Sequence, residues 1–131
     1  MIVVDSNVLA CLYLPGPHTE AAERLYQQDA EWHAPILWRS QYRNILAGYM
    51  RRGSLTFEQA LAIQHEAESL LNGAEHEADS RRVLELVKAS DCSAYDCEFI
   101  ALAEALGVAA VTMDATLIKA FPKIARSLTA A

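Results

Sequence analysis

Short β-like runs and longer helical patterns alternate along the whole chain. Residues 2–4 form a β-branched run that stops at Asp5, and residues 108–112 form a second apolar run that is followed by Asp114. Weaker strands are predicted around residues 32–34 and 126–129. The spacing of apolar residues predicts helices over residues 7–14, 19–28, about 35–52, 57–71, 81–88, 94–106 and 115–120. Strands separated by helices predict a parallel sheet that is covered on both faces.

Several helix ends carry recognisable signals. Thr56 with Gln59 and Ser93 with Asp96 have the spacing of capping boxes, and Gly107 is placed to end the second of these helices. Asp79 or Ser80 is expected to cap the helix over residues 81–88, and Pro35 is expected early in its helix. The apolar residues at helical spacing in the helix that Ser93 opens are expected in the core: Tyr95, Phe99, Leu102 and Leu106.

The composition fits one globular domain. The chain has 131 residues, of which 53% are apolar and 21% charged, so we expect a single domain over residues 1–131 with a normal core. No apolar run is long enough to cross a bilayer and no signal segment follows Met1, which predicts a cytoplasmic protein with no membrane partner. Three cysteines without metal-type spacing predict reduced, partly buried thiols: Cys11, Cys92 and Cys97.

The formal net charge of −6 argues against binding nucleic acid through a broad basic surface. One predicted helix carries Arg39, Arg43, Arg51 and Arg52, which indicates either a local track for RNA or a partner, or simply a solvated face. The four histidines lack metal-ligand spacing and receive no role: His18, His33, His65 and His76.

Three acids are candidates for a metal site. Asp5 and Asp114 follow strands, and in parallel sheets ligands gather at the carboxyl ends of the strands. Asp96 joins them if its helix begins at the same edge. Taken one at a time, each acid is better explained by helix capping than by metal binding. Together they would repel one another without a cation, and carboxylate oxygens suit Mg²⁺ or Mn²⁺, which indicates phosphodiester hydrolysis.

Four segments in order resemble the PIN domain in the form found in VapC-type toxins. They are residues 2–9 (IVVDSNVL), residues 34–38 (APILW) leading into Asn44, residues 95–103 (YDCEFIALA), and the stretch from Gly107 to Asp114 that ends in VTMD. The resemblance covers essentially the whole chain. It implies a three-layer α/β domain with a short, mostly parallel sheet, acting as a Mg²⁺- or Mn²⁺-dependent endoribonuclease with an antitoxin partner and a homodimeric state.

By that resemblance Asp5, Asp96 and Asp114 are the metal-binding acids. Ser6, Asn7 and Thr112 are then polar neighbours that orient substrate or water, with Asn44 in the same supporting group. The sequence departs from the family at Gln41, where a Glu is usual, three residues before Asn44. Gln41 is expected to complete the site either as a neutral metal ligand or as a group that contacts the ligands without touching the metal. The missing charge should lower cation affinity.

Alternatives remain open on the residues alone. A degenerate PIN domain would bind a protein or RNA without cleaving it. In an active nuclease, Asp91 or Glu98 is a candidate to replace the missing acid, although Glu98 points away from Asp96 around the helix. An aspartyl phosphotransferase with Asp5 as nucleophile fits less well, because the companion position holds Asn7. An exposed apolar face with Leu12, Tyr13 and Leu14 is a candidate dimer or antitoxin contact.

Overall fold

A five-stranded parallel sheet forms the centre of the computed structural model, which describes residues 1–129. The strands run in the order β3-β2-β1-β4-β5. All four strand pairings are parallel, and Val3 on the central strand lies opposite both His33 and Ala110. The strands are β1 (Ile2–Val4), β2 (Trp32–Pro35), β3 (Glu75–His76), β4 (Ala110–Thr112) and β5 (Ala125–Ser127).

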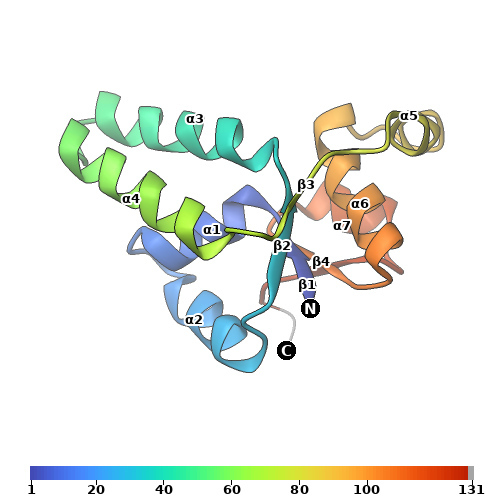
Figure 1. Cartoon of the computed structure of the whole chain (residues 1–131), viewed down its shortest axis with the longest axis horizontal. Coiled ribbons are helices and arrows are strands. Elements are labelled where there is room, and N and C mark those ends of the chain that lie inside the picture. Colours follow the sequence, from blue (N-terminus) through green and yellow to red (C-terminus); the bar gives the residue numbers. More distant parts are fainter. Residues whose placement is uncertain (130–131) are drawn as a thin grey trace.

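Helices cover both faces of the sheet (Figure 1), as the alternating pattern predicts. One side carries α1 to α4 and the other carries α5 to α7. The helices are α1 (Ser6–Tyr13), α2 (Thr19–Gln28), α3 (Trp38–Arg51), α4 (Phe57–Leu70), α5 (Ser80–Lys88), α6 (Ala94–Leu106) and α7 (Ala115–Ala120). The predicted three-layer α/β architecture is therefore confirmed.

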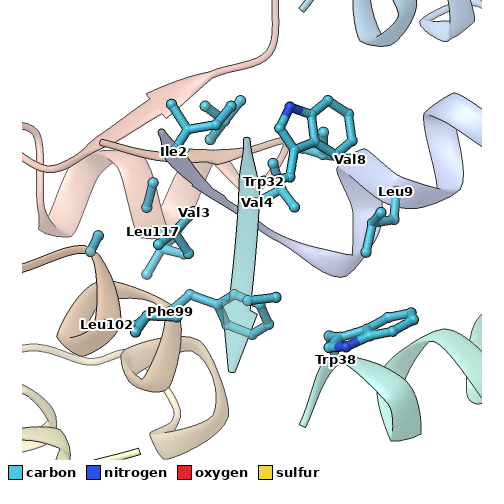
Figure 2. Close-up of a cluster of buried hydrophobic side chains, with 14 of the residues drawn as sticks. Ile2, Val3, Val4, Val8, Leu9, Trp32, Trp38, Phe99, Leu102 and Leu117 are labelled. Atoms are coloured by element: carbon cyan, nitrogen blue, oxygen red, sulfur yellow. The ribbon is translucent and has the colours of Figure 1, made fainter. Parts of the chain in front are cut away.

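The central strands are buried on both faces, which explains their continuous apolar runs. In Figure 2, Trp38 of α3 lies on one side of the strands, and Phe99 and Leu102 of α6 lie on the other. Trp32, Trp38, Tyr42 and Phe99 are the largest fully buried side chains. These layers hold the carboxyl ends of β1 and β4 side by side, because the chain leaves β1 toward β2 and later returns to β4 on its other side.

Some predicted helix signals are confirmed and one is not. Thr56 Oγ1 accepts from Gln59 N–H at 3.1 Å and Gln59 Oε1 accepts from Thr56 N–H at 2.9 Å, which completes the capping box. Gly107 ends α6 at φ 68°, a left-handed conformation that suits glycine. Asp79 occupies the N-cap position of α5, but its side chain makes no capping hydrogen bond.

The expectation that Pro35 starts a helix is wrong. Pro35 is the last residue of β2, and α3 begins three residues later at Trp38. Proline is acceptable at a strand end, and the ladder resumes where Ile36 N–H donates to His76 O at 2.9 Å. The partner strand β3 has only two residues, too few to leave an apolar pattern in the sequence.

Two expectations about apolar residues need correction. Tyr95 is not a core residue, because 62% of its surface is exposed, whereas Phe99 and Leu102 on the same stripe are buried. The stripe is buried only where α6 crosses the sheet, and Tyr95 precedes that region. Leu14 is buried, and Leu12 and Tyr13 are partly buried against the core. The predicted exposed apolar face on α1 is therefore absent.

Arg39 belongs to an internal ion pair rather than to a basic track. Its guanidinium donates to both carboxylate oxygens of Glu75, at 2.6 and 2.7 Å, and to Glu68 at 3.3 Å. Trp38 Nε1 donates to the same Glu75 carboxylate at 2.8 Å. This network fastens the start of α3 to β3 and α4. Arg43, Arg51 and Arg52 are exposed, which fits the solvated face.

The cysteines agree with the prediction. All three are free thiols, with Cys92 and Cys97 buried and Cys11 partly buried. Among residues 1–129, none of the helices combines the length and apolar character needed to span a membrane.

Candidate active site

Asp5 is at the centre of the polar cluster at the carboxyl end of β1. Only 8% of its surface is exposed. As the N-cap of α1 it accepts from Ser6 N–H at 2.7 Å through Oδ1, which is the helix-capping role the sequence left open. Its second oxygen accepts from Thr112 Oγ1 at 2.8 Å. Both carboxylate oxygens are thus held in place by donors from two different elements.

Thr112 connects two of the candidate acids. Besides donating to Asp5, its hydroxyl oxygen accepts from Asp114 N–H at 3.0 Å. This buried hydroxyl therefore fixes the backbone at Asp114 relative to the Asp5 carboxylate. Asp114 is also the N-cap of α7, because its Oδ1 accepts from Thr116 N–H at 2.9 Å. That single oxygen makes the capping bonds, so the other carboxylate oxygen is not needed for the cap.

Asp96 reaches the site from the opposite layer. It lies in the first turn of α6, where Ser93 caps the helix by accepting from Asp96 N–H at 3.1 Å. Ile100 and Ala103, one and two turns further along the same stripe, are fully buried. Asp96 is only partly buried, so its carboxylate stands at the solvent-facing end of a stripe that packs on the sheet.

Gln41 is joined directly to the cluster. Ser6 Oγ donates to Gln41 Oε1 at 2.6 Å, which links the first turn of α1 to α3. Gln41 is partly buried and Ser6 is buried. The amide oxygen of Gln41 is therefore satisfied by a side chain of the site.

Asn7 and Asn44 differ in their positions. Asn7 Oδ1 accepts from Met113 N–H at 3.2 Å, and its amide nitrogen lies 3.5 Å from Asp5 Oδ2, so Asn7 fastens α1 to the segment after β4. Asn44 is exposed on α3, and within the described part of the chain its side chain makes no hydrogen bond. The structure brings Asn7 into the network and leaves Asn44 on the outer part of α3.

Burial and nearby negative charge disfavour ionisation of Asp5 and Asp96. Burial raises the pKa of Asp5, and the charges of Asp96 and Asp114 raise it further, while hydrogen bonds from Thr112 and Ser6 lower it. Burial also raises the pKa of Asp96, with Asp114 adding to the effect and a hydrogen bond from Ser93 opposing it. Carboxylates from three separate elements therefore lie close enough to repel one another.

The donor set suits a hard divalent cation that keeps part of its water. Among residues 1–129 no three His, Cys, Asp or Glu side chains stand close enough to enclose a metal ion by themselves. Mg²⁺ is usually held by one or two carboxylates and several waters, so a tight protein cage is not required. Asp5, Asp96 and Asp114 have the right oxygen chemistry, and Gln41 offers a neutral oxygen.

A family model of the PIN domain matches residues 2–124. The chain therefore belongs to the PIN domain family, and the resemblance read from its four motifs is confirmed. Within that family it is similar to Ribonuclease VapC3 of Pyrobaculum aerophilum, which is 29% identical over 126 residues, 94% of this chain and 96% of that protein.

Solved structures agree on the fold. The crystal structure of FitAcB from Neisseria gonorrhoeae superimposes with a TM-score of 0.78 at 16% identity, covering 100% of both chains. The structure of PAE2754 from Pyrobaculum aerophilum gives a TM-score of 0.75 at 21% identity, over 97% of this chain and 90% of the other. A toxin-antitoxin complex from Klebsiella pneumoniae gives 0.67 at 12% identity, over 98% of both chains.

Two features of the site were not predicted from the sequence. Thr112 was expected to orient substrate or water, but it also bridges Asp5 and Asp114. The sequence of β4 already carried a signal, since a threonine is unusual in a strand buried on both faces. The contact between Ser6 and Gln41 joins residues 35 positions apart and has no local signal.

Proposed function

We propose that this protein is a metal-dependent endoribonuclease of the VapC toxin type. One observation supports the proposal: the charges of Asp96 and Asp114, which belong to two other elements, raise the pKa of the buried Asp5 carboxyl at the end of β1. A cation relieves that repulsion, and the similarity to Ribonuclease VapC3 supports RNA as the substrate.

The chain's own residues would hold and orient the reacting groups. Asp5, Asp96 and Asp114 would hold Mg²⁺ or Mn²⁺, and Gln41 would take part as a neutral oxygen. When bound, such an ion lowers the pKa of water and offsets charge on a phosphodiester. Ser6 and Thr112 keep the Gln41 and Asp5 oxygens in fixed orientations, so little reorganisation is needed when substrate arrives.

The test compares RNA cleavage by the wild type, Asp5→Asn and Gln41→Glu, each with and without Mn²⁺. The wild type should cleave only with the ion, Asp5→Asn should lose at least about 100-fold in rate, and Gln41→Glu should cleave at lower Mn²⁺ concentrations. Arg43→Gln, an exposed change on the same helix as Gln41, is the matched control. Equal cleavage by the wild type and Asp5→Asn would exclude the site.

A binding module without nuclease activity is the second candidate, and Gln41 is the observation that favours it. One carboxylate fewer lowers the attraction for a cation. Calorimetric titration with Mn²⁺ separates the two functions: the nuclease should show stoichiometric heat that Asp5→Asn removes, and a binding module should show none.

An antitoxin protein as partner, a homodimeric state and a cytoplasmic location belong to the same proposal. The toxin-antitoxin complex among the similar structures supports a protein partner. Sedimentation equilibrium of the purified chain tests the dimer, and co-purification with the product of an adjacent small gene tests the antitoxin.

A further inference from the structure

Tyr95 is an exposed aromatic residue beside the acid cluster. Its exposed fraction of 62% places it among the most exposed large apolar side chains of residues 1–129. It immediately precedes Asp96 in the first turn of α6, so their Cα atoms are about 3.8 Å apart. A ring at this position lies within one or two nucleotides of any phosphodiester held at the acids.

The other exposed apolar side chains have local explanations or lie elsewhere. Met50, Phe57 and Leu61 line one apolar groove between α3 and α4. Tyr26 packs edge-on against Trp32 with ring centroids 5.3 Å apart. Leu84 is on the outer face of α5, Met1 is the first residue, and Ile36 is an aliphatic residue in the turn between β2 and α3. Tyr95 is thus the exposed aromatic ring next to a candidate acid.

The negative charge of the protein leaves little electrostatic attraction for RNA, and stacking on an aromatic ring can supply affinity instead. The chain carries a formal net charge of −6, and the acids add local negative charge where a phosphodiester would have to approach. Arg39, on the helix that carries Gln41, is already engaged by Glu75. Proteins that bind single-stranded nucleic acid combine backbone contacts with base stacking, which contributes about 1–3 kcal/mol per base and tolerates any base.

We propose that Tyr95 is a nucleobase-binding residue, whose ring stacks on an unpaired base of single-stranded RNA next to the phosphodiester at the acids. This inference rests on the proposed function because it takes RNA as the ligand. The ring then supplies the affinity that a basic surface supplies in other proteins. Because the contact is stacking, it positions the strand without reading its sequence.

The experiment measures binding without cleavage. Fluorescence anisotropy of a labelled 12-nucleotide oligoadenylate with hydrolysis-resistant phosphorothioate linkages is recorded in Mn²⁺, with the full chain and all its acids in place. Adding Tyr95→Ala should weaken binding by about 5- to 150-fold, and Tyr95→Trp should restore it to within about twofold. The matched control is Phe57→Ala, which removes a ring of 61% exposure from the far end of the α3–α4 pair.

A second oligonucleotide, which lacks bases, completes the test. On an oligonucleotide of the same length with abasic riboses, Tyr95→Ala should have no effect, since there is no base to stack on. Equal losses on both oligonucleotides, or no loss on either, would overturn the proposal. If binding is unchanged but Tyr95→Ala turns a dimer into a monomer, the ring is a contact between copies and the proposal is also overturned.

The two proposals fail in different ways. Absence of Mn²⁺-dependent cleavage by the wild type removes the nuclease but leaves ring-dependent binding to be seen in the anisotropy assay. If the wild type cleaves RNA but Tyr95→Ala leaves RNA affinity unchanged, the nuclease proposal stands and the base-binding role of Tyr95 is excluded. The helix content of Tyr95→Ala shows whether a loss of binding comes from a loss of structure. It should not fall, because alanine favours helices.

Discussion

Asp5 caps a helix, but its buried negative charge lowers the stability of the metal-free protein. Its carboxylate caps α1 and receives two further hydrogen-bond donors, yet burial and two nearby acids make its charge unfavourable. Residues kept for chemistry often lower the stability of the free protein in this way. At the residue scale, we therefore expect Asp5 to lower the stability of the metal-free protein while it raises the affinity for a cation.

Replacing Asp5 by Asn should stabilise the metal-free protein by roughly 0.5–2 kcal/mol at pH 7, because the unfavourable charge is removed while an acceptor for Ser6 N–H remains. Urea denaturation in EDTA measures the free energy of unfolding. Asp79→Asn is the control, since Asp79 sits at a helix N-cap without a side-chain hydrogen bond. A variant clearly less stable than the wild type would contradict this account.

The pH dependence of the same comparison checks the cause. Burial raises the folded-state pKa of Asp5 above its ordinary value of 3.8, so above that pH the folded state binds more protons than the unfolded state. Its contribution to stability therefore falls as pH rises from about 4 through the folded pKa. The difference between Asp5→Asn and the wild type should be near zero at pH 4 and largest at neutral pH.

At the element scale, the start of α3 is held by the pair of Arg39 and Glu75. The pair joins α3 to the edge strand β3, and Arg39 also contacts Glu68 on α4. The Arg39 pair holds the pKa of Glu75 below its usual range. Gln41 lies two residues after Arg39, so the same contact sets where α3 presents its amide to Ser6.

Arg39→Met should lower the free energy of unfolding by about 1–3 kcal/mol, because the partly buried Glu75 keeps only Trp38 as a donor. Urea denaturation at pH 7 measures the change. Arg43→Met, an exposed change one turn further along α3, should stay within about 0.5 kcal/mol of the wild type. Equal effects of the two variants would show that the ion pair contributes no stability.

His33 and His76 join β2 to the edge strand β3. Their Nδ1 and Nε2 atoms are 2.8 Å apart, a hydrogen bond that requires one ring nitrogen to lack a proton. Burial lowers the pKa of His76, and the neighbouring His33 adds to this. Two protonated rings would face each other with two N–H groups and no acceptor.

Stability should therefore fall as pH drops below about 6.5, because there the unfolded chain binds more protons than the folded state. His76→Gln should make the stability curve flatter between pH 7 and pH 5. Thermal denaturation across that range is the measurement, with the exposed His65→Gln on α4 as the control. An unchanged slope in His76→Gln would remove this pair as the cause.

At the scale of the whole molecule, the net charge limits how RNA is bound. A protein with 17 acidic and 11 basic residues has few cations to spare for phosphates. The slope of log affinity against log salt should be shallow, of magnitude about 2 or less, which is two or three phosphate contacts on a single strand. Anisotropy titrations from low to moderate salt measure it, and a slope near −5 would contradict the prediction.

Local patterns determined most of the elements and named most of the polar cluster. The apolar runs that end at Asp5 and Asp114, and the helix start at Ser93, are signals within a few residues. From them followed the parallel sheet and the candidates Asp5, Asp96 and Asp114, whereas the family and Gln41 came from the resemblance of four segments to the PIN domain. Backbone preference and apolar spacing are local properties, so one sequence suffices for them.

Only the tertiary structure decided which polar groups meet and which apolar groups stay outside. It placed Gln41 against Ser6, made Thr112 the bridge between two acids, and left Tyr95 exposed at the end of a stripe that is otherwise buried. It also formed the two-residue β3 and its contacts to α3. These depend on pairs of residues far apart in the chain, whose contact is set by packing of the layers rather than by any local preference.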